Sequence, residues 1–346
     1  MTGWGLDQNV KEAYTFLVEN YDNGRKKGSK SKERDQIYIF GFSRGAYSAR
    51  VLAGFIHAVG LIERRNLNLL DYAYRAYKRV DDDTKNASFV EVRLYERILD
   101  PDRPPIRLLG LFDTVSSLIE HGRYGPRLRS HAFTEKNWSV ESVRHAVAID
   151  ERRTMFRPQL WPSGEEYWGN PFNRGNAKPQ DTREVWFTGV HGDVGGGYPE
   201  EESGLAKIPL KWMIEQTGKM GLYYRTQSVN ELVLGTNSKK DYVKPNENGQ
   251  MHNSMNWAWG ILEFIPRLRP KDSQRPSLFD ISIPFFERRN IPAGGFIHQS
   301  VIDRSGTKKA SPPNLPKNYP VEEPLPPRGA KTRIGKKAAQ VKSSAH

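Results

Sequence analysis

The chain has 346 residues, 37% of them hydrophobic and 11% aromatic, which is enough apolar material for a substantial core. It has no cysteine, no apolar run approaching the roughly 20 residues that cross a bilayer, and no signal-peptide pattern at its start. The net charge is +13, but residues 305–346 supply +7 of it, so the remainder carries only +6. These features exclude disulfides and cysteine-based metal sites, and they favour a globular protein synthesised in the cytoplasm.

The first sixty residues predict a helix, a loop, a strand and a second helix. Residues 9–21 carry apolar side chains at helical spacing, whereas residues 22–35 are too polar and basic to pack and are interpreted as a surface loop. Residues 36–42 (QIYIFGF) are short, β-branched and aromatic, as a buried strand should be. A helical pattern follows over residues 43–60, which gives the order strand, tight turn, helix.

The middle of the chain continues this alternation. A helix is predicted over residues 69–79, a buried strand over residues 106–112 (IRLLGLF) and a helix over residues 140–149. The stretch from 150 to 181 is rich in Trp, Pro and Gly and has no clear period, so it could form a lid or a substrate loop.

The last predicted elements are a buried strand over residues 184–190 (EVWFTGV) and a helix over residues 205–220. From residue 305 the chain has seven Pro, many Lys and almost no apolar residues, so residues 305–346 are predicted to be a disordered basic tail. We therefore expect one α/β domain over residues 1–304, with a mostly parallel sheet and helices on both faces.

In such sheets, sites form beyond the carboxyl ends of the strands. Ser43, Asp113 and His191 follow the three predicted strands in turn. Ser43 lies in Gly41-Phe42-Ser43-Arg44-Gly45, which matches the G-x-S-x-G pattern of a serine on a sharp strand-to-helix turn. The next helix and the Arg44 amide could stabilise an oxyanion there. A structural turn is the alternative interpretation of the motif.

A nucleophilic serine needs a base, and the base needs an acid that fixes its tautomer. Asp113 and His191 have the chain order Ser, Asp, His of the hydrolase fold. Asp113 could instead cap a helix or form a turn, and His191 could be a core histidine. Asp193 with His298 obeys the same order and ranks second. His191 and Asp193 are too few ligands to indicate a metal, and no cofactor is predicted.

Five ordered blocks of sequence resemble one protein family. They are GFSRGAYSAR (residues 41–50), LFDTV (111–115), AIDERR with a following F-x-P and W (148–161), EVWFTGVHGDVGGGY (184–198) and IHQSVIDR (297–304). Together they resemble the α/β-hydrolase family that includes the phospholipase effectors of bacterial type VI secretion. That resemblance implies Ser43, Asp113 and His191 as the catalytic serine, aspartate and histidine, and cleavage of phospholipid esters.

The chain departs from this family at its start. Family members normally have a strand, an F-D-G-T-like segment and further sheet elements before the serine strand, whereas this chain begins at the helix just ahead of that strand. We therefore expect a partial, N-terminally truncated domain without the usual second oxyanion amide and with an exposed sheet edge. A misplaced start codon, a partner chain that completes the sheet, or a decayed and inactive copy would each account for this.

The first functional interpretation is an esterase or lipase that acts on lipids through an acyl-enzyme. The second is an inactive hydrolase-fold interaction module, which the missing N-terminal elements favour. Nucleic-acid binding ranks last because the sequence has no recognisable binding motif. The basic tail is expected to contact anionic membrane surfaces if it binds anything, and export by a system that needs no signal peptide is an expectation from the family resemblance.

Overall fold

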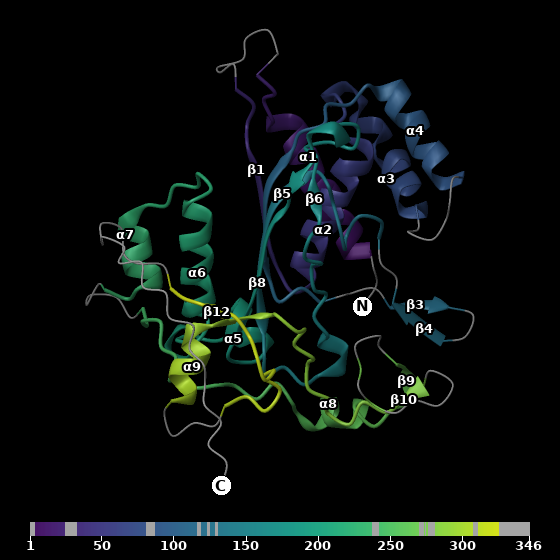
Figure 1. Ribbon diagram of the computed structural model, residues 1–346. Helices are drawn as coiled ribbons and strands as arrows, with labels where there is room; N and C mark the ends of the chain where they lie inside the picture. The colour runs from purple at the N-terminus through teal and green to yellow at the C-terminus, as the bar shows by residue number, and fades with distance from the viewer. Residues whose placement is uncertain are drawn as a thin grey trace.

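The computed structural model describes the chain apart from several segments (Figure 1). The segments outside the described residues are 1–3, 25–32, 81–86, 116–118, 123–124, 129–130, 237–241, 270–272, 274, 276–280, 307–310 and 325–346. Among the helices in the described ranges, none is both long and apolar enough to cross a membrane.

A parallel sheet of six strands forms the centre of the described part of the molecule (Figure 1). In spatial order the strands are β1 (Ile37–Phe42), β2 (Ile106–Phe112), β5 (Val140–Ala148), β8 (Asp181–Phe187), β11 (Phe296–His298) and β12 (Val321–Glu322). Every neighbouring pair is parallel. Phe42 pairs with Phe112, and Phe112 pairs with Ala146, so these carboxyl ends lie at one edge of the sheet. The predicted α/β class is confirmed.

Helices cover both faces of this sheet, and Figure 1 shows α1 to α4 on one side and α6 with α7 on the other. The helices are α1 (Trp4–Asn20), α2 (Arg44–Val59), α3 (Leu70–Arg79), α4 (Ala87–Leu99), α5 (His191–Gly195), α6 (Lys207–Gly218), α7 (Thr226–Ser228), α8 (Trp257–Leu262) and α9 (Gln299–Ser305). The α2 helix packs on β1 and β2, and its buried Tyr47, Phe55 and Ile56 join the largest apolar cluster. On the opposite face, Trp212 and Met213 of α6 pack against Ala146, Val185 and Phe187.

In the described ranges, three short antiparallel strand pairs lie outside the main sheet. They are β3 (Ile119–Gly122) with β4 (Gly125–Leu128), β6 (Glu166–Tyr167) with β7 (Lys178–Pro179), and β9 (Arg267–Leu268) with β10 (Ile281–Ser282). The second pair falls in the aperiodic stretch of residues 150–181, so part of that stretch has secondary structure of its own.

Most of the predicted elements are confirmed with small shifts in their ends. The predicted helices at 9–21, 43–60, 69–79 and 205–220 correspond to α1, α2, α3 and α6, and the predicted strands at 36–42, 106–112 and 184–190 correspond to β1, β2 and β8. The predicted loop at 22–35 lies partly outside the described residues.

The prediction of a helix over residues 140–149 is wrong, because this segment is the central strand β5. Its polar residues mimic a helical period, but Ser142, Arg144 and His145 are buried with the apolar ones. Arg144 donates to Asp181 Oδ2 (2.7 Å), and His145 Nδ1 lies 2.8 Å from Glu184 Oε2. A strand covered on both faces has no alternation of polar and apolar residues, so its period alone is misleading.

The predicted boundary at residue 304 also differs from the structure. The segment 321–322 forms β12, which adds to the edge of the sheet beside β11. Glu322 is buried there and accepts hydrogen bonds from Trp212 Nε1 and Gln216 Nε2, both at 3.1 Å. The folded unit therefore extends past residue 304. The hydrogen bonds of Glu322 and the pairing of β12 with β11 hold this otherwise polar segment in place. Of the predicted tail, residues 307–310 and 325–346 lie outside the described residues.

Candidate active site

Ser43 lies on the sharp turn between β1 and α2. Its backbone has φ 59° and ψ −125°, a strained conformation for a residue with a side chain. The turn needs glycine at position 41, where an added Cβ would lie 2.4 Å from the carbonyl oxygen of Gly45. At Gly45 itself an added Cβ meets nothing within 4 Å. Steric restriction therefore requires glycine at position 41 of the motif but not at position 45.

Asp113 follows β2 directly and is fully buried. Its backbone also has a positive φ, 42°, and its amide donates to the carbonyl of Ala146 on β5 (2.7 Å). One carboxylate oxygen, Oδ1, accepts from the amide of Ala148 (2.9 Å). The ends of β2 and β5 together fix this side chain.

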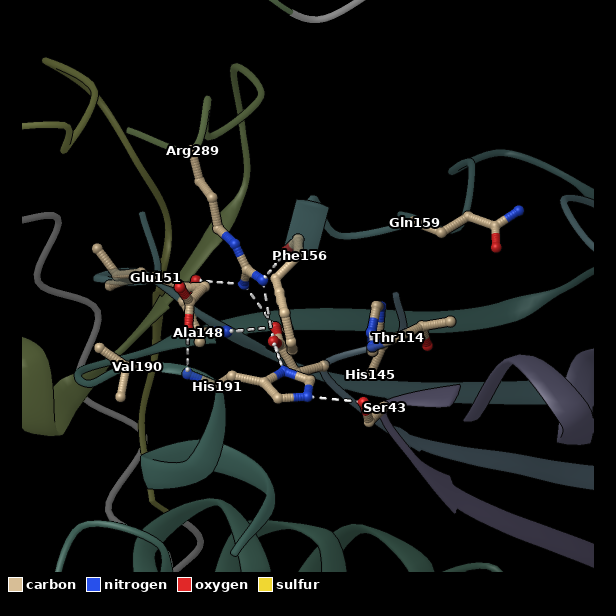
Figure 2. Close-up of polar contacts among 12 residues, drawn as sticks. Ser43, Thr114, His145, Ala148, Glu151, Phe156, Gln159, Val190, His191 and Arg289 are labelled. Carbon is tan, nitrogen blue, oxygen red and sulfur yellow. Dashed lines mark hydrogen bonds and ion pairs between the residues drawn. The ribbon is translucent and has the colours of Figure 1, made fainter. Parts of the chain in front are cut away.

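His191 is the first residue of the short helix α5, which begins a few residues after β8. Its Nδ1 lies 2.5 Å from Asp113 Oδ2, and its Nε2 lies 2.7 Å from Ser43 Oγ (Figure 2). An ionised carboxylate can only accept, so the imidazole proton is on Nδ1 and Nε2 accepts from the Ser43 hydroxyl. The rings of Phe42 and Phe156 pack beside the imidazole, with centroids 4.6 and 5.0 Å away.

Arg289 is a member of this site that sequence reasoning missed. Its guanidinium is buried and donates to both oxygens of Asp113, at 2.6 and 3.0 Å (Figure 2). It also donates to the carbonyls of Ala148 (2.8 Å) and Phe156. No sequence motif surrounds position 289, so Arg289 is identified only by its bidentate hydrogen bonds to a buried carboxylate.

The pKa of Asp113 lies well below its usual range. Burial alone would raise the pKa, but the charge of Arg289 and the hydrogen bonds from His191 and Arg289 outweigh burial. Asp113 is therefore an ionised carboxylate throughout the neutral pH range, which is what holding a histidine tautomer requires.

Glu151 fixes the loop between β5 and the site. It is buried, and it accepts from the amide of His191 (3.2 Å), from Ser254 Oγ (2.9 Å) and from the amide and guanidinium of Arg153. Burial would raise its pKa, but the Arg153 hydrogen bonds and charge lower it to about 2. This carboxylate belongs to the AIDERR block, so the block has a structural use: it orients the start of α5.

The alternative pair, Asp193 and His298, is not brought to Ser43. Asp193 instead lies 2.6 Å from Nδ1 of His252, and it accepts from the amide of Val190 at the start of α5. His298 ends β11, and its Nδ1 lies 2.8 Å from Ser300 Oγ. Of the two sets predicted from the sequence, the structure connects Ser43, Asp113 and His191.

The fold and this site define an α/β protein of hydrolase-like architecture, with a serine at a strand-to-helix turn. The chain belongs to the family described as "T6SS, Phospholipase effector Tle1-like, catalytic domain", whose model matches residues 1–216. Family membership confirms the resemblance drawn from the sequence blocks.

Similar proteins include one curated relative and two solved structures. The curated relative is "Uncharacterized protein YEL023C" of Saccharomyces cerevisiae, 24% identical over 67% of this chain and 48% of that protein. The chain thus spans about half the length of this relative. A crystal structure of an uncharacterised protein from Pseudomonas aeruginosa is similar at 22% identity and a TM-score of 0.32, over 62% of this chain and 27% of that one. A structure of the Tle1 effector bound to the VgrG spike from the type VI secretion system is similar at 21% identity and a TM-score of 0.27, over 58% and 32% of the two chains.

Proposed function

We propose that this chain is a serine hydrolase that cleaves carboxylic esters of lipids, phospholipids included, with Ser43, His191 and Asp113 as its catalytic triad. The observation that carries the proposal is the continuous line from Ser43 Oγ to His191 Nε2 (2.7 Å) and from His191 Nδ1 to Asp113 Oδ2 (2.5 Å). Membership in a family of phospholipase effector domains supports the lipid ester as substrate.

In the proposed reaction, His191 Nε2 takes the proton of the Ser43 hydroxyl as Oγ attacks the ester carbonyl carbon. The backbone N–H of Arg44, at the start of α2, donates to the oxyanion that forms, and the positive end of the helix dipole adds to this stabilisation. The alcohol leaves with the proton from His191, and a water molecule then hydrolyses the acyl group on Ser43 by the same steps in reverse order.

Asp113 and Arg289 act behind the histidine. Asp113 holds the Nδ1–H tautomer and stabilises the imidazolium, while Arg289 keeps the carboxylate ionised and oriented through its two hydrogen bonds. Export by a system that needs no signal peptide is part of the proposal, and it rests on the family alone.

The direct test compares Ser43→Ala with Ser48→Ala. Ser48 lies in α2, the helix that Ser43 precedes, and its hydroxyl donates to the carbonyl of Arg44. It is therefore a matched control. Turnover is measured on a soluble short-chain ester and on phospholipid vesicles. We expect Ser43→Ala to abolish turnover of both and Ser48→Ala to retain it. Wild-type turnover in Ser43→Ala would overturn the assignment of the nucleophile.

The acid and base are tested on the same substrates. Asp113→Asn should lower kcat by roughly 10⁴-fold, as expected for a triad aspartate that sets the histidine tautomer. His298→Gln should leave kcat within a few-fold of wild type, because among the described residues the hydrogen bonds of its ring go to Ser300 and not to Ser43 or His191. The reverse pattern would favour the alternative pair. No turnover in the wild-type chain would favour the second function, an inactive interaction module of hydrolase fold.

A further inference from the structure

Large apolar side chains are exposed along α8 and the turn that follows it. Trp257 is 81% exposed and Ile261 57%, and Phe264 is also exposed. Trp257 and Ile261 are four positions apart, which places them on one face of α8, and Phe264 follows in the turn after the helix. The exposed Phe285 packs edge to face on Phe264, with ring centroids 5.4 Å apart. We call Trp257, Ile261, Phe264 and Phe285 the α8 patch. Soluble proteins rarely expose a contiguous apolar patch unless it contacts something.

The α8 patch is fixed to the candidate active site. Trp259, on the same helix, packs edge to face on Phe156 (5.5 Å), and Phe156 packs in the same way on His191 (5.0 Å). Glu263, fully buried at the end of α8, accepts from the amide and the hydroxyl of Thr154 at 2.8 and 2.6 Å. Figure 1 shows α8 at the same end of the molecule as α5, the helix that begins at His191.

Two guanidinium groups lie over aromatic rings at this patch. Arg275 lies over the ring of Phe285, with the guanidinium carbon 6.0 Å from the ring centroid. Arg152 lies in the same way over the ring of Phe286 (5.6 Å), and Phe286 packs edge to face on Phe264, with ring centroids 5.5 Å apart. Arg288, two residues after Phe286, is exposed. The acidic residues among the described part of this region are engaged: Glu263 is buried against Thr154, and Glu287 pairs with Arg157. An apolar face with a cationic rim complements a surface with an apolar interior and anionic phosphates.

We propose that the α8 patch docks onto the surface of an anionic phospholipid bilayer and so brings Ser43 to its substrate. The proposal deepens the proposed function and rests on it. The α8 helix spans only six residues, so it would lie in the headgroup region with Trp257 and Ile261 inserted, rather than cross the bilayer.

The test measures co-sedimentation with vesicles of phosphatidylcholine and phosphatidylglycerol, using Ser43→Ala protein so that the vesicles stay intact. Adding Trp257→Ser and Ile261→Ser should lower the vesicle partition coefficient at least ten-fold. Tyr223→Ser is the matched control: this ring is 94% exposed but lies outside the patch, so partition should stay within two-fold. Partition should also fall when phosphatidylglycerol is omitted or salt is raised.

A parallel measurement separates docking from chemistry. With Ser43 intact, the double variant should turn over a soluble short-chain ester at the wild-type rate but lose turnover of vesicle lipid at least ten-fold. If no chain hydrolyses any ester and partition still falls ten-fold, the docking surface stands and the proposed function fails. Unchanged partition in the double variant would overturn the docking surface. So would a concentration-dependent dimer that the double variant abolishes, because a second copy would then occupy the patch.

Discussion

Arg289 offers a sharp test of how the site is held together. In Arg289→Met, the fully buried Asp113 would keep, of its side-chain partners among the described residues, the amide of Ala148 (2.9 Å) and Nδ1 of His191 (2.5 Å). Removing one member of a buried ion pair costs about 3–5 kcal/mol, because the remaining charge is left without compensation. This loss is a large share of a typical folding free energy of about 5–15 kcal/mol.

The same change should alter the pH dependence of catalysis. Burial raises the pKa of Asp113, and the charge and hydrogen bonds of Arg289 are among the causes that lower it, so the pKa of Asp113 should rise when the guanidinium is lost. The protonated carboxyl, which no longer holds the Nδ1–H tautomer of His191, should therefore persist to higher pH. We expect the acid limb of kcat/KM to move upward by about one pH unit, equivalent to about 1.4 kcal/mol.

The measurements are urea unfolding at pH 7 and kcat/KM on a soluble ester from pH 5 to pH 9. Arg103→Met is the matched control, since Arg103 is also largely buried but contacts the His57 carbonyl (2.8 Å) and Glu96 (3.2 Å), not the site. It should lower stability and leave the pH profile in place. An acid limb that does not move in Arg289→Met, despite a loss of stability, would refute this electrostatic account of Arg289.

Two further predictions concern the turns at the site. Gly41→Ala should abolish ester turnover and destabilise the fold, because its Cβ would lie 2.4 Å from the Gly45 carbonyl oxygen. Gly45→Ala should keep most activity, because the added Cβ meets open space. Ester turnover and urea unfolding check both variants. For His252, burial lowers the pKa, but the hydrogen bonds to Asp193 and Glu202 outweigh it and raise the pKa above 6.5. The stabilisation is therefore full below pH 6.5 and is lost as pH rises through the raised pKa. His252→Gln should lower the unfolding free energy at pH 5.5 more than at pH 9, and an equal loss at both would contradict the charge-based reasoning.

The sequence was sufficient to predict those elements whose local residue pattern agrees with their place in the fold. The strand β1, the turn at Ser43 and the helix α2 are encoded within about twenty consecutive residues, so apolar spacing and one motif identify them together. Asp113 and His191 could be selected because each follows a predicted strand, and parallel strands end at one edge. That rule holds even though β5, taken for a helix, lies between β2 and β8.

The strand β5 and the role of Arg289 could not be predicted in this way, because both depend on contacts between residues that are far apart in the sequence. Arg144 and His145 made β5 look amphipathic, and only Asp181 and Glu184 on β8 explain how polar side chains can be buried there. Arg289 reaches Asp113 across 176 positions of sequence, from a segment without a regular period. A buried charge needs its partner in space rather than in sequence, so the residues that tune the site were the hardest to predict. Ser43, the proposed nucleophile, was the easiest to predict, because it lies on a strained turn whose sequence pattern is local.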